Sequence, residues 1–87
     1  MKAIYWDLSK SEELKSERGA SFEDLLNQGQ LVAIKKHPKR ENQDIMLFEF
    51  KDYIWVVPFV KEKSGIIFLK TLFPSRKYTK IIKEEKP

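Results

Sequence analysis

The sequence has no cysteine, a single histidine and three glycines that stand alone, and each shortage argues against a class of protein. Without cysteine there is neither a disulfide nor a thiolate metal site, so packing alone holds the core, as is usual in the cytosol. Isolated glycines form no phosphate-binding loop. One histidine provides no zinc-binding pair, and no serine stands at a recognisable spacing from it. We therefore expect no cofactor and no metal, and nucleotide-dependent or acyl-transfer chemistry is disfavoured.

Long hydrophobic runs are also missing. No apolar stretch approaches the roughly 20 residues that cross a bilayer, and residues 1–6 lack the apolar core and cleavage site of a signal peptide. We therefore expect a soluble, cytoplasmic protein without a membrane partner. Because 41% of the 87 residues are hydrophobic, the composition predicts a globular chain, and its length fits a single domain over residues 1–87.

Charge is unevenly distributed along the chain. Residues 1–30 hold four Lys or Arg against six Asp or Glu, whereas residues 31–87 hold thirteen against seven. Such asymmetry predicts a basic face for a polyanion or an acidic protein partner. Lys-rich surfaces are also common in small soluble proteins, so charge alone does not decide between these interpretations.

The first residues predict a strand followed by a helix. Residues 2–6 are β-branched and aromatic, which is typical of a short strand. Good helix formers follow over residues 8–18, where Asp7 or Ser9 caps the first turn and Gly19 ends the helix. The helix has few apolar residues, so we expect it on the surface with a narrow contact stripe. That stripe consists of Leu8 and Leu14.

A second helix and a charged loop come next. The segment Ser21-Phe22-Glu23-Asp24 matches the capping-box pattern at a helix start, and Gly29 ends this short helix. Residues 31–34 then read as a strand that runs into the charged loop 35–42.

Alternating and apolar patterns from residue 31 onward predict an antiparallel meander. Met46, Phe48 and Phe50 fall on one face of their strand, and Lys51-Asp52 makes a plausible tight turn. Pro58 predicts that its strand lies partly at a sheet edge or a bulge. The expected strands cover residues 31–34, 45–50, 53–60 and 66–73.

A short helix is expected after residue 75, because Tyr78, Ile81 and Ile82 stand at helical spacing before the charged tail 83–87. The predicted fold is therefore α+β: an N-terminal strand and two helices, a three- to four-stranded antiparallel meander, and a short C-terminal helix.

Several motifs resemble the BrnT family of bacterial toxins. They are the opening Tyr5-Trp6-Asp7, Lys10, the segment Gly19 to Asp24, and Arg76-Lys77-Tyr78-Thr79 after the last strand. The order of elements is similar along almost the whole chain. Arg18 stands where that family usually has His, and the helix after Thr79 is shorter.

The resemblance implies a RelE-like fold and a metal-independent endoribonuclease that inhibits translation by cleaving RNA, either free or on the ribosome. It also implies a partner antitoxin, expected to be a small ribbon-helix-helix DNA-binding protein, through which higher assemblies form.

Candidate site residues follow from what RNA cleavage requires. Arg76 can form a bidentate bond to a phosphate, and Tyr78 can stack on a base or donate a proton. His37 is the natural acid or base, with Glu41 as the second candidate base. Six cations are candidates for binding the RNA backbone: Lys36, Lys39, Arg40, Lys70, Lys77 and Lys80.

Each candidate also has a structural interpretation. A lone His in a Lys-rich loop, such as His37, is more often a solvated loop residue, and Tyr78 suits a core contact as well as a stacking role. The chain as a whole can be a non-catalytic basic module that binds RNA, DNA or an acidic protein, or a toxin-fold relative without catalysis. Three aromatic residues are candidates for stacking in such a module: Tyr53, Trp55 and Phe59.

Overall fold

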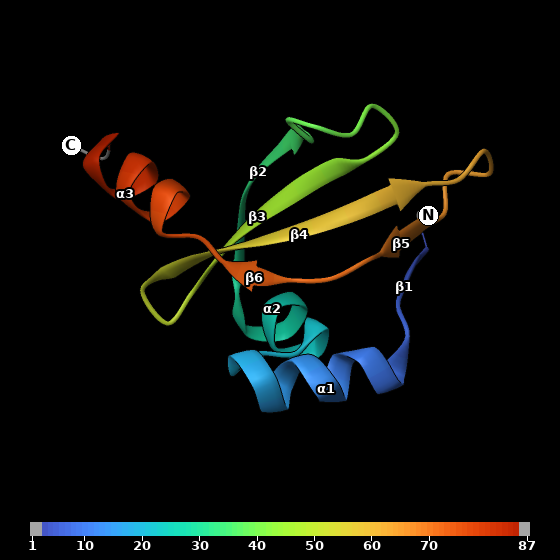
Figure 1. The fold of residues 1–87 in the computed structure, drawn as a ribbon, viewed down its shortest axis with the longest axis horizontal. Helices are drawn as coiled ribbons and strands as arrows, with labels where there is room; N and C mark the ends of the chain where they lie inside the picture. The colour runs from blue at the N-terminus through green and yellow to red at the C-terminus, as the bar shows by residue number, and fades with distance from the viewer. Residues whose placement is uncertain (1–2, 86–87) are drawn as a thin grey trace.

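The computed structural model describes residues 3–85, which form three helices and a six-stranded sheet (Figure 1). The strand order is β1-β5-β4-β3-β2, and β6 pairs with β4. In chain order the elements are β1 (Ile4–Tyr5), α1 (Leu8–Arg18), α2 (Phe22–Gln28), β2 (Gln30–Lys36), β3 (Asp44–Phe50), β4 (Tyr53–Lys61), β5 (Ile67–Leu69), β6 (Phe73–Pro74) and α3 (Arg76–Glu85).

The predicted ends of α1 and α2 are confirmed. The Asp7 carboxylate accepts a hydrogen bond from the Lys10 N–H at 3.1 Å, and Gly19 ends α1 with a φ of 90°. At the start of α2, the Ser21 hydroxyl accepts from the Asp24 N–H while the Asp24 carboxylate accepts from the Ser21 N–H. Both helices therefore begin with a side-chain acceptor that satisfies a free N–H group.

The contact stripe of α1 differs from the prediction. Leu14 is fully buried, but Leu8 is 69% exposed. Ser11 is the other buried residue of α1. Its hydroxyl accepts a hydrogen bond from the Phe22 N–H and donates one to the Glu23 carboxylate at 2.6 Å. A small hydroxyl fits here because it bonds directly to the first turn of α2.

Each face of the sheet carries its own apolar cluster. The β3 residues Met46, Phe48 and Phe50 pack with α1 and α2, as their predicted alternation requires. Ile45 and Leu47 pack on the opposite face with α3. Figure 1 shows α1 and α2 together on one side and α3 apart from them. Strand β4 is buried on both faces, as predicted from its continuous apolar run.

The hairpin between β3 and β4 turns at Lys51 and Asp52, as predicted. Their φ angles of 53° and 63° lie in the left-handed region. A two-residue turn with positive φ at both positions matches the twist of the flanking strands.

The expectation of one continuous strand over residues 66–73 is wrong, because the chain leaves the sheet between β5 and β6. Leu69 and Leu72 are buried in the same cluster, although residues three apart in a strand face opposite sides. The chain must therefore turn between them. The Arg18 guanidinium donates a hydrogen bond to the Leu72 carbonyl and so satisfies the interrupted backbone.

Pro58 is not at a sheet edge, because β4 is central in the sheet. It lies between the β4 residues paired with β5 and those paired with β6. The Lys70 N–H donates to the Pro58 carbonyl at 2.9 Å, and in an antiparallel strand the N–H and C=O of one residue point to the same side. The side of β4 on which Pro58 has no N–H group therefore faces the break between β5 and β6.

Two further boundaries differ from expectation. Strand β1 covers only Ile4–Tyr5 and joins the sheet in parallel with β5, so the sheet is mixed. Lys2, the first residue of the predicted strand, lies outside the described residues. Helix α3 continues through residues 83–85 of the predicted tail. Between residues 3 and 85 no helix is long and apolar enough to span a bilayer.

Candidate functional site

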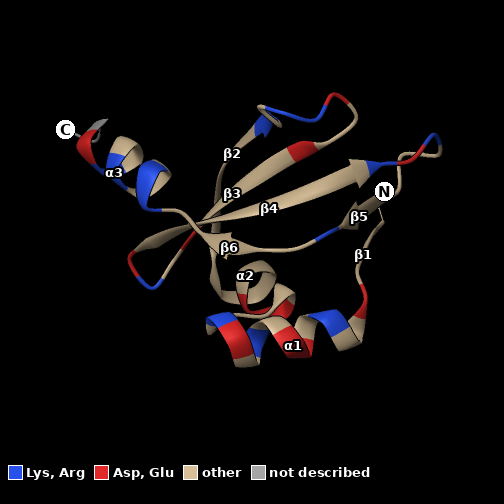
Figure 2. Ribbon diagram, in the orientation of Figure 1, with Lys and Arg blue, Asp and Glu red and all other residues tan. Residues whose placement is uncertain are grey.

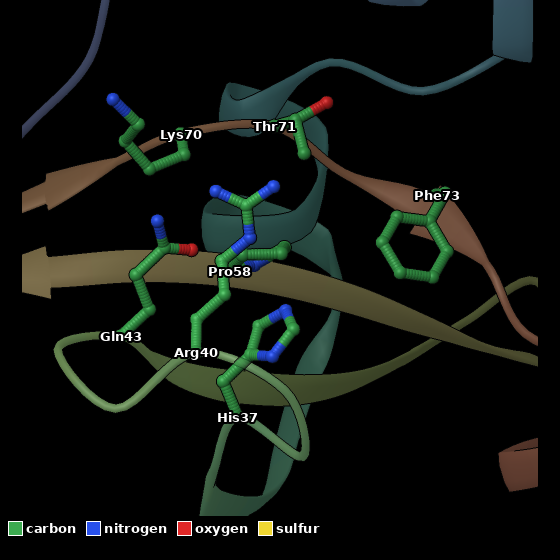
Figure 3. A pocket seen from close by; sticks show the side chains of 7 residues that line it. All are labelled: His37, Arg40, Gln43, Pro58, Lys70, Thr71 and Phe73. Carbon is green, nitrogen blue, oxygen red and sulfur yellow. The ribbon is translucent and has the colours of Figure 1, made fainter.

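The break between β5 and β6 opens a pocket on the α3 side of the sheet. Pro58 lies on the same face of β4 as Ile54 and Val56, because residues two apart in a strand share a face, and that face is turned toward α3. Helix α3 covers the Ile54 and Val56 end, and the pocket occupies the Pro58 end. Its volume is about 350 Å³, and seven residues line it: His37, Arg40, Gln43, Pro58, Lys70, Thr71 and Phe73 (Figure 3).

The β2–β3 loop places His37 and Arg40 in this pocket. The His37 N–H donates to the Gln43 carbonyl at 3.1 Å, and the Gln43 N–H donates to the Arg40 carbonyl at 3.3 Å. These bonds close the loop on itself, so that His37, Arg40 and Gln43 all reach the same pocket.

One ring nitrogen of His37 is already occupied. The Lys39 N–H donates to its Nδ1 at 3.0 Å. A neutral imidazole that accepts at Nδ1 carries its hydrogen on Nε2. In this loop conformation a neutral His37 ring is therefore a hydrogen-bond donor through Nε2.

The pocket is basic and contains no carboxylate among its lining residues. In Figure 3 the Arg40 side chain extends across Pro58, and its guanidinium points toward the segment that carries Lys70 and Thr71. The Lys70 ammonium points away from Arg40 and lies 5.7 Å from the Phe68 ring. Arg40 is thus the cation that points into the space between the strands.

Phe73, the last residue of the strand expected over residues 66–73, is not part of the buried core. Its side chain is 38% exposed and lines the pocket. Strand β6 pairs Phe73 with Val56, and the turn at Leu72 determines which face the phenyl group occupies.

The predicted residues of α3 form a second group beside the pocket. Arg76, Lys77 and Lys80 are exposed at the start of the helix, where Figure 2 shows Lys and Arg gathered. Tyr78 packs against the apolar cluster under α3, with the ammonium groups of Lys35 and Lys77 at 5.9 and 6.0 Å from its ring. Of the two interpretations of Tyr78, the core contact is therefore the one present in the structure.

The structure brings together three of the ten candidates: His37, Arg40 and Lys70. The other seven do not line the pocket: Lys36, Lys39, Glu41, Arg76, Lys77, Tyr78 and Lys80. His37 and Arg40 thus line the pocket together, whereas Arg76 does not line it.

Two of the three aromatic residues suggested for a binding module are buried, and the third is half-buried. Trp55 is 8% exposed and Phe59 is 3% exposed, whereas Tyr53 keeps part of its surface exposed and packs against the core. Within the described part of the chain, no group of three or more His, Cys, Asp or Glu side chains is placed to hold a metal ion.

Four pocket residues were missed by sequence reasoning: Gln43, Pro58, Thr71 and Phe73. Pro58 gave a partial signal, because a proline inside an apolar strand indicates an interruption on one side. Phe73 stands beside Pro74 at the end of an apolar run, a pattern that predicted a strand and gave no sign of an exposed ring. Gln43 and Thr71 gave no signal.

The fold is similar to that of a ribonuclease toxin. The crystal structure of the Brucella abortus ribonuclease toxin BrnT matches with a TM-score of 0.57 and 20% sequence identity, over 86% of this chain and 96% of the toxin chain. Comparisons with protein-family models and with curated proteins gave no match. The α+β fold that the sequence motifs implied is confirmed, and this chain has a BrnT-like fold.

Proposed function

We propose that this protein is the toxin of a toxin–antitoxin pair and cleaves RNA in the pocket between the β2–β3 loop and the β5–β6 break. The observation that carries the proposal is a pocket lined by His37, Arg40 and Lys70, without a carboxylate, on a BrnT-like fold. The similarity to a ribonuclease toxin supports the type of reaction, and the side chains of the pocket support an anionic substrate.

Arg40 is the residue that binds the scissile phosphate in this proposal. Its planar guanidinium forms two parallel hydrogen bonds to phosphate oxygens, and it stabilises the negative charge that builds up as the ribose 2′-oxygen bonds to phosphorus and the bond from phosphorus to the 5′-oxygen breaks. Water takes up the proton of the 2′-hydroxyl and supplies one to the leaving 5′-oxygen. His37 donates a further hydrogen bond through Nε2. Because Nδ1 is held by the Lys39 N–H, His37 acts as a donor to the phosphate rather than as the acid or base.

The cations outside the pocket bind flanking phosphates. Arg76, Lys77 and Lys80 lie at the start of α3, and Lys36 and Lys39 lie on or next to the β2–β3 loop. Each is exposed, so each acts as a surface charge that guides a polyanion rather than as part of the reacting centre. Glu41 is also exposed outside the pocket, and it has no role in this proposal.

The same basic surface suits an inhibitor. An acidic or amphipathic segment of an antitoxin would neutralise Arg40 and the α3 cations while blocking entry of RNA. We propose a small ribbon-helix-helix protein as this antitoxin, and the cytoplasm as the place where both act.

The central test measures cleavage of a single-stranded RNA, free and during translation in a cell-free extract. Arg40→Ala is expected to reduce cleavage by about 100-fold or more, because one preorganised donor to a developing charge has an effect of that size. Lys63→Ala is the matched control, since it removes an exposed cation from the β4–β5 loop, away from the pocket. Circular dichroism verifies that both variants fold.

Two outcomes would count against the proposal. If Arg40→Ala cleaves as well as the wild type, the pocket is not the reaction site. If the wild type binds RNA tightly but neither cleaves it nor stops translation, the protein is a binding module or a relative without catalysis.

A further inference from the structure

We propose that Phe73 is a stacking platform that holds one unpaired base of the RNA next to the phosphate bound by Arg40. This inference rests on the proposed function, because it concerns the same pocket. It adds a substrate requirement: the nucleotide at this position must be single-stranded, since a base inside a duplex has both faces covered.

The position of Phe73 is unusual for a phenylalanine. Strand β6 has only two residues, and one of them presents a phenyl group that is 38% exposed. The same apolar run buries Leu69 and Leu72 almost completely. The turn that buries Leu72 therefore leaves Phe73 on the pocket face, where its ring is available to a ligand.

The backbone beneath the ring is held firmly. Phe73 pairs with Val56 and Pro74 pairs with Trp55, and the Ser75 N–H donates to the Ile54 carbonyl at 2.8 Å. A rigid aromatic surface loses little conformational freedom when a base stacks on it, which favours binding.

The arrangement of the pocket matches the parts of a nucleotide. Figure 3 shows Phe73 at one end of the pocket, with His37 and Arg40 between it and Gln43. A base stacked on Phe73 therefore has its phosphate on the side of the two nitrogen donors. A volume of about 350 Å³ is at the lower end of the range for small-ligand pockets, about 300–1,000 Å³, and suits a single nucleotide.

Stacking of this kind discriminates poorly among bases, because every base has a π-face. We expect removal of the base to weaken binding by about five- to 150-fold, the range for a base stacked on an aromatic side chain. Exchange of one base for another has a smaller effect.

The experiment measures dissociation constants for a short oligoribonucleotide and for versions in which one nucleotide at a time lacks its base. Phe73→Leu keeps an apolar side chain but removes the π-face, whereas Phe73→Trp keeps the π-face. Ile81→Ala is the matched control, because Ile81 is also 38% exposed but lies on α3 outside the pocket. The tryptophan of Phe73→Trp also reports stacking directly through quenching of its fluorescence.

For the wild type we expect one position in the oligoribonucleotide at which loss of the base weakens binding by about five- to 150-fold. Phe73→Leu abolishes that difference, Phe73→Trp retains it and is quenched on binding, and Ile81→Ala behaves as the wild type. If removal of the base still weakens binding to Phe73→Leu while Arg40→Ala loses cleavage, the proposal that Phe73 is a stacking platform is wrong and the proposed function stands. If the wild type binds no RNA, both are overturned.

Discussion

Glu23 is the residue on which the packing of the N-terminal elements depends. One carboxylate oxygen accepts from the Ser11 hydroxyl at 2.6 Å, and the other accepts from the Trp6 indole N–H at 2.8 Å. The hydrogen bond from Ser11 lowers the pKa of Glu23, with smaller contributions from its own backbone N–H and from Trp6. One carboxylate thus links α1, α2 and the residue that follows β1.

Glu23→Gln is expected to lower the free energy of unfolding by about 1–3 kcal/mol at neutral pH, because an amide replaces a charged acceptor by one oxygen and one donor. Since folding lowers the pKa of Glu23, its contribution is fully present above the ordinary glutamate value of about 4.3 and is lost as the pH falls through the folded value. Urea unfolding of both proteins from pH 7 to pH 3 measures this. If the difference in free energy of unfolding between the two proteins stays constant from pH 7 to pH 3, the ionised Glu23 carboxylate is not the source of the stability.

His37 provides a second test at the scale of one residue. If it only donates through Nε2, His37→Gln retains a donor and cleavage falls by about tenfold or less, in line with the loss of one ordinary hydrogen bond. If it transfers a proton, cleavage falls by about 100- to 10,000-fold. Single-turnover rates of the variant distinguish the two roles, and the larger loss would mean that the Lys39 bond to Nδ1 opens during the reaction.

At the scale of elements, a threonine of α3 hydrogen-bonds to the backbone of β4. The Thr79 hydroxyl accepts from the Ile54 N–H at 2.8 Å and donates to the Ser75 carbonyl at 2.6 Å. Ile54 is fully buried, so its N–H has no access to water. The hydroxyl takes the place of a neighbouring strand at this position.

Thr79→Val has nearly the same shape but leaves the Ile54 N–H without an acceptor. We expect it to destabilise the protein by about 1–3 kcal/mol, the cost of burying an unsatisfied donor. Thr79→Ser retains the hydroxyl and is the matched control. Urea unfolding monitored by circular dichroism compares the three proteins, and equal stability of Thr79→Val and the wild type would show that this bond contributes nothing.

Local signals were sufficient to predict most elements. The Asp7 and Ser21 caps and Gly19 give the ends of the first two helices, since capping depends on neighbouring residues alone. The break after β5 could not be predicted, because Leu69 and Leu72 look alike in an apolar run and only tertiary packing places them in one cluster. The parallel pairing of β1 with β5 could not be predicted either, because Ile4 and its partner Ile67 are distant in the sequence.

Only the cationic and hydrogen-bond-donating residues of the site could be predicted from the sequence. His37, Arg40 and Lys70 are recognisable as candidates because phosphate requires cations and donors. Which of them share a pocket depends on the break between β5 and β6, and so does the exposure of Phe73. Arg76 follows a strand end, but the chain enters α3 at that point, and Arg76 does not line the pocket.

At the scale of the whole molecule, the uneven charge predicts RNA binding that depends on salt. The logarithm of the affinity falls linearly with the logarithm of the salt concentration, with a slope of about −0.7 per phosphate contact for a single strand. Arg40→Ala is expected to make the slope shallower by about 0.7, and Lys63→Ala to leave it unchanged. Titrations at several salt concentrations measure this, and equal slopes for Arg40→Ala and the wild type would remove Arg40 from the interface.

The pairing of β1 with β5 constrains when the protein can fold during synthesis. Ile4 is translated early, but its partner Ile67 belongs to the last part of the described chain, and the Ile67 N–H donates to the Ala3 carbonyl at 2.9 Å. The edge of the sheet next to β5 therefore stays open until residue 67 has left the ribosome. Thr71 and Phe73 come after that point, so the pocket that they line forms only once these residues have also emerged.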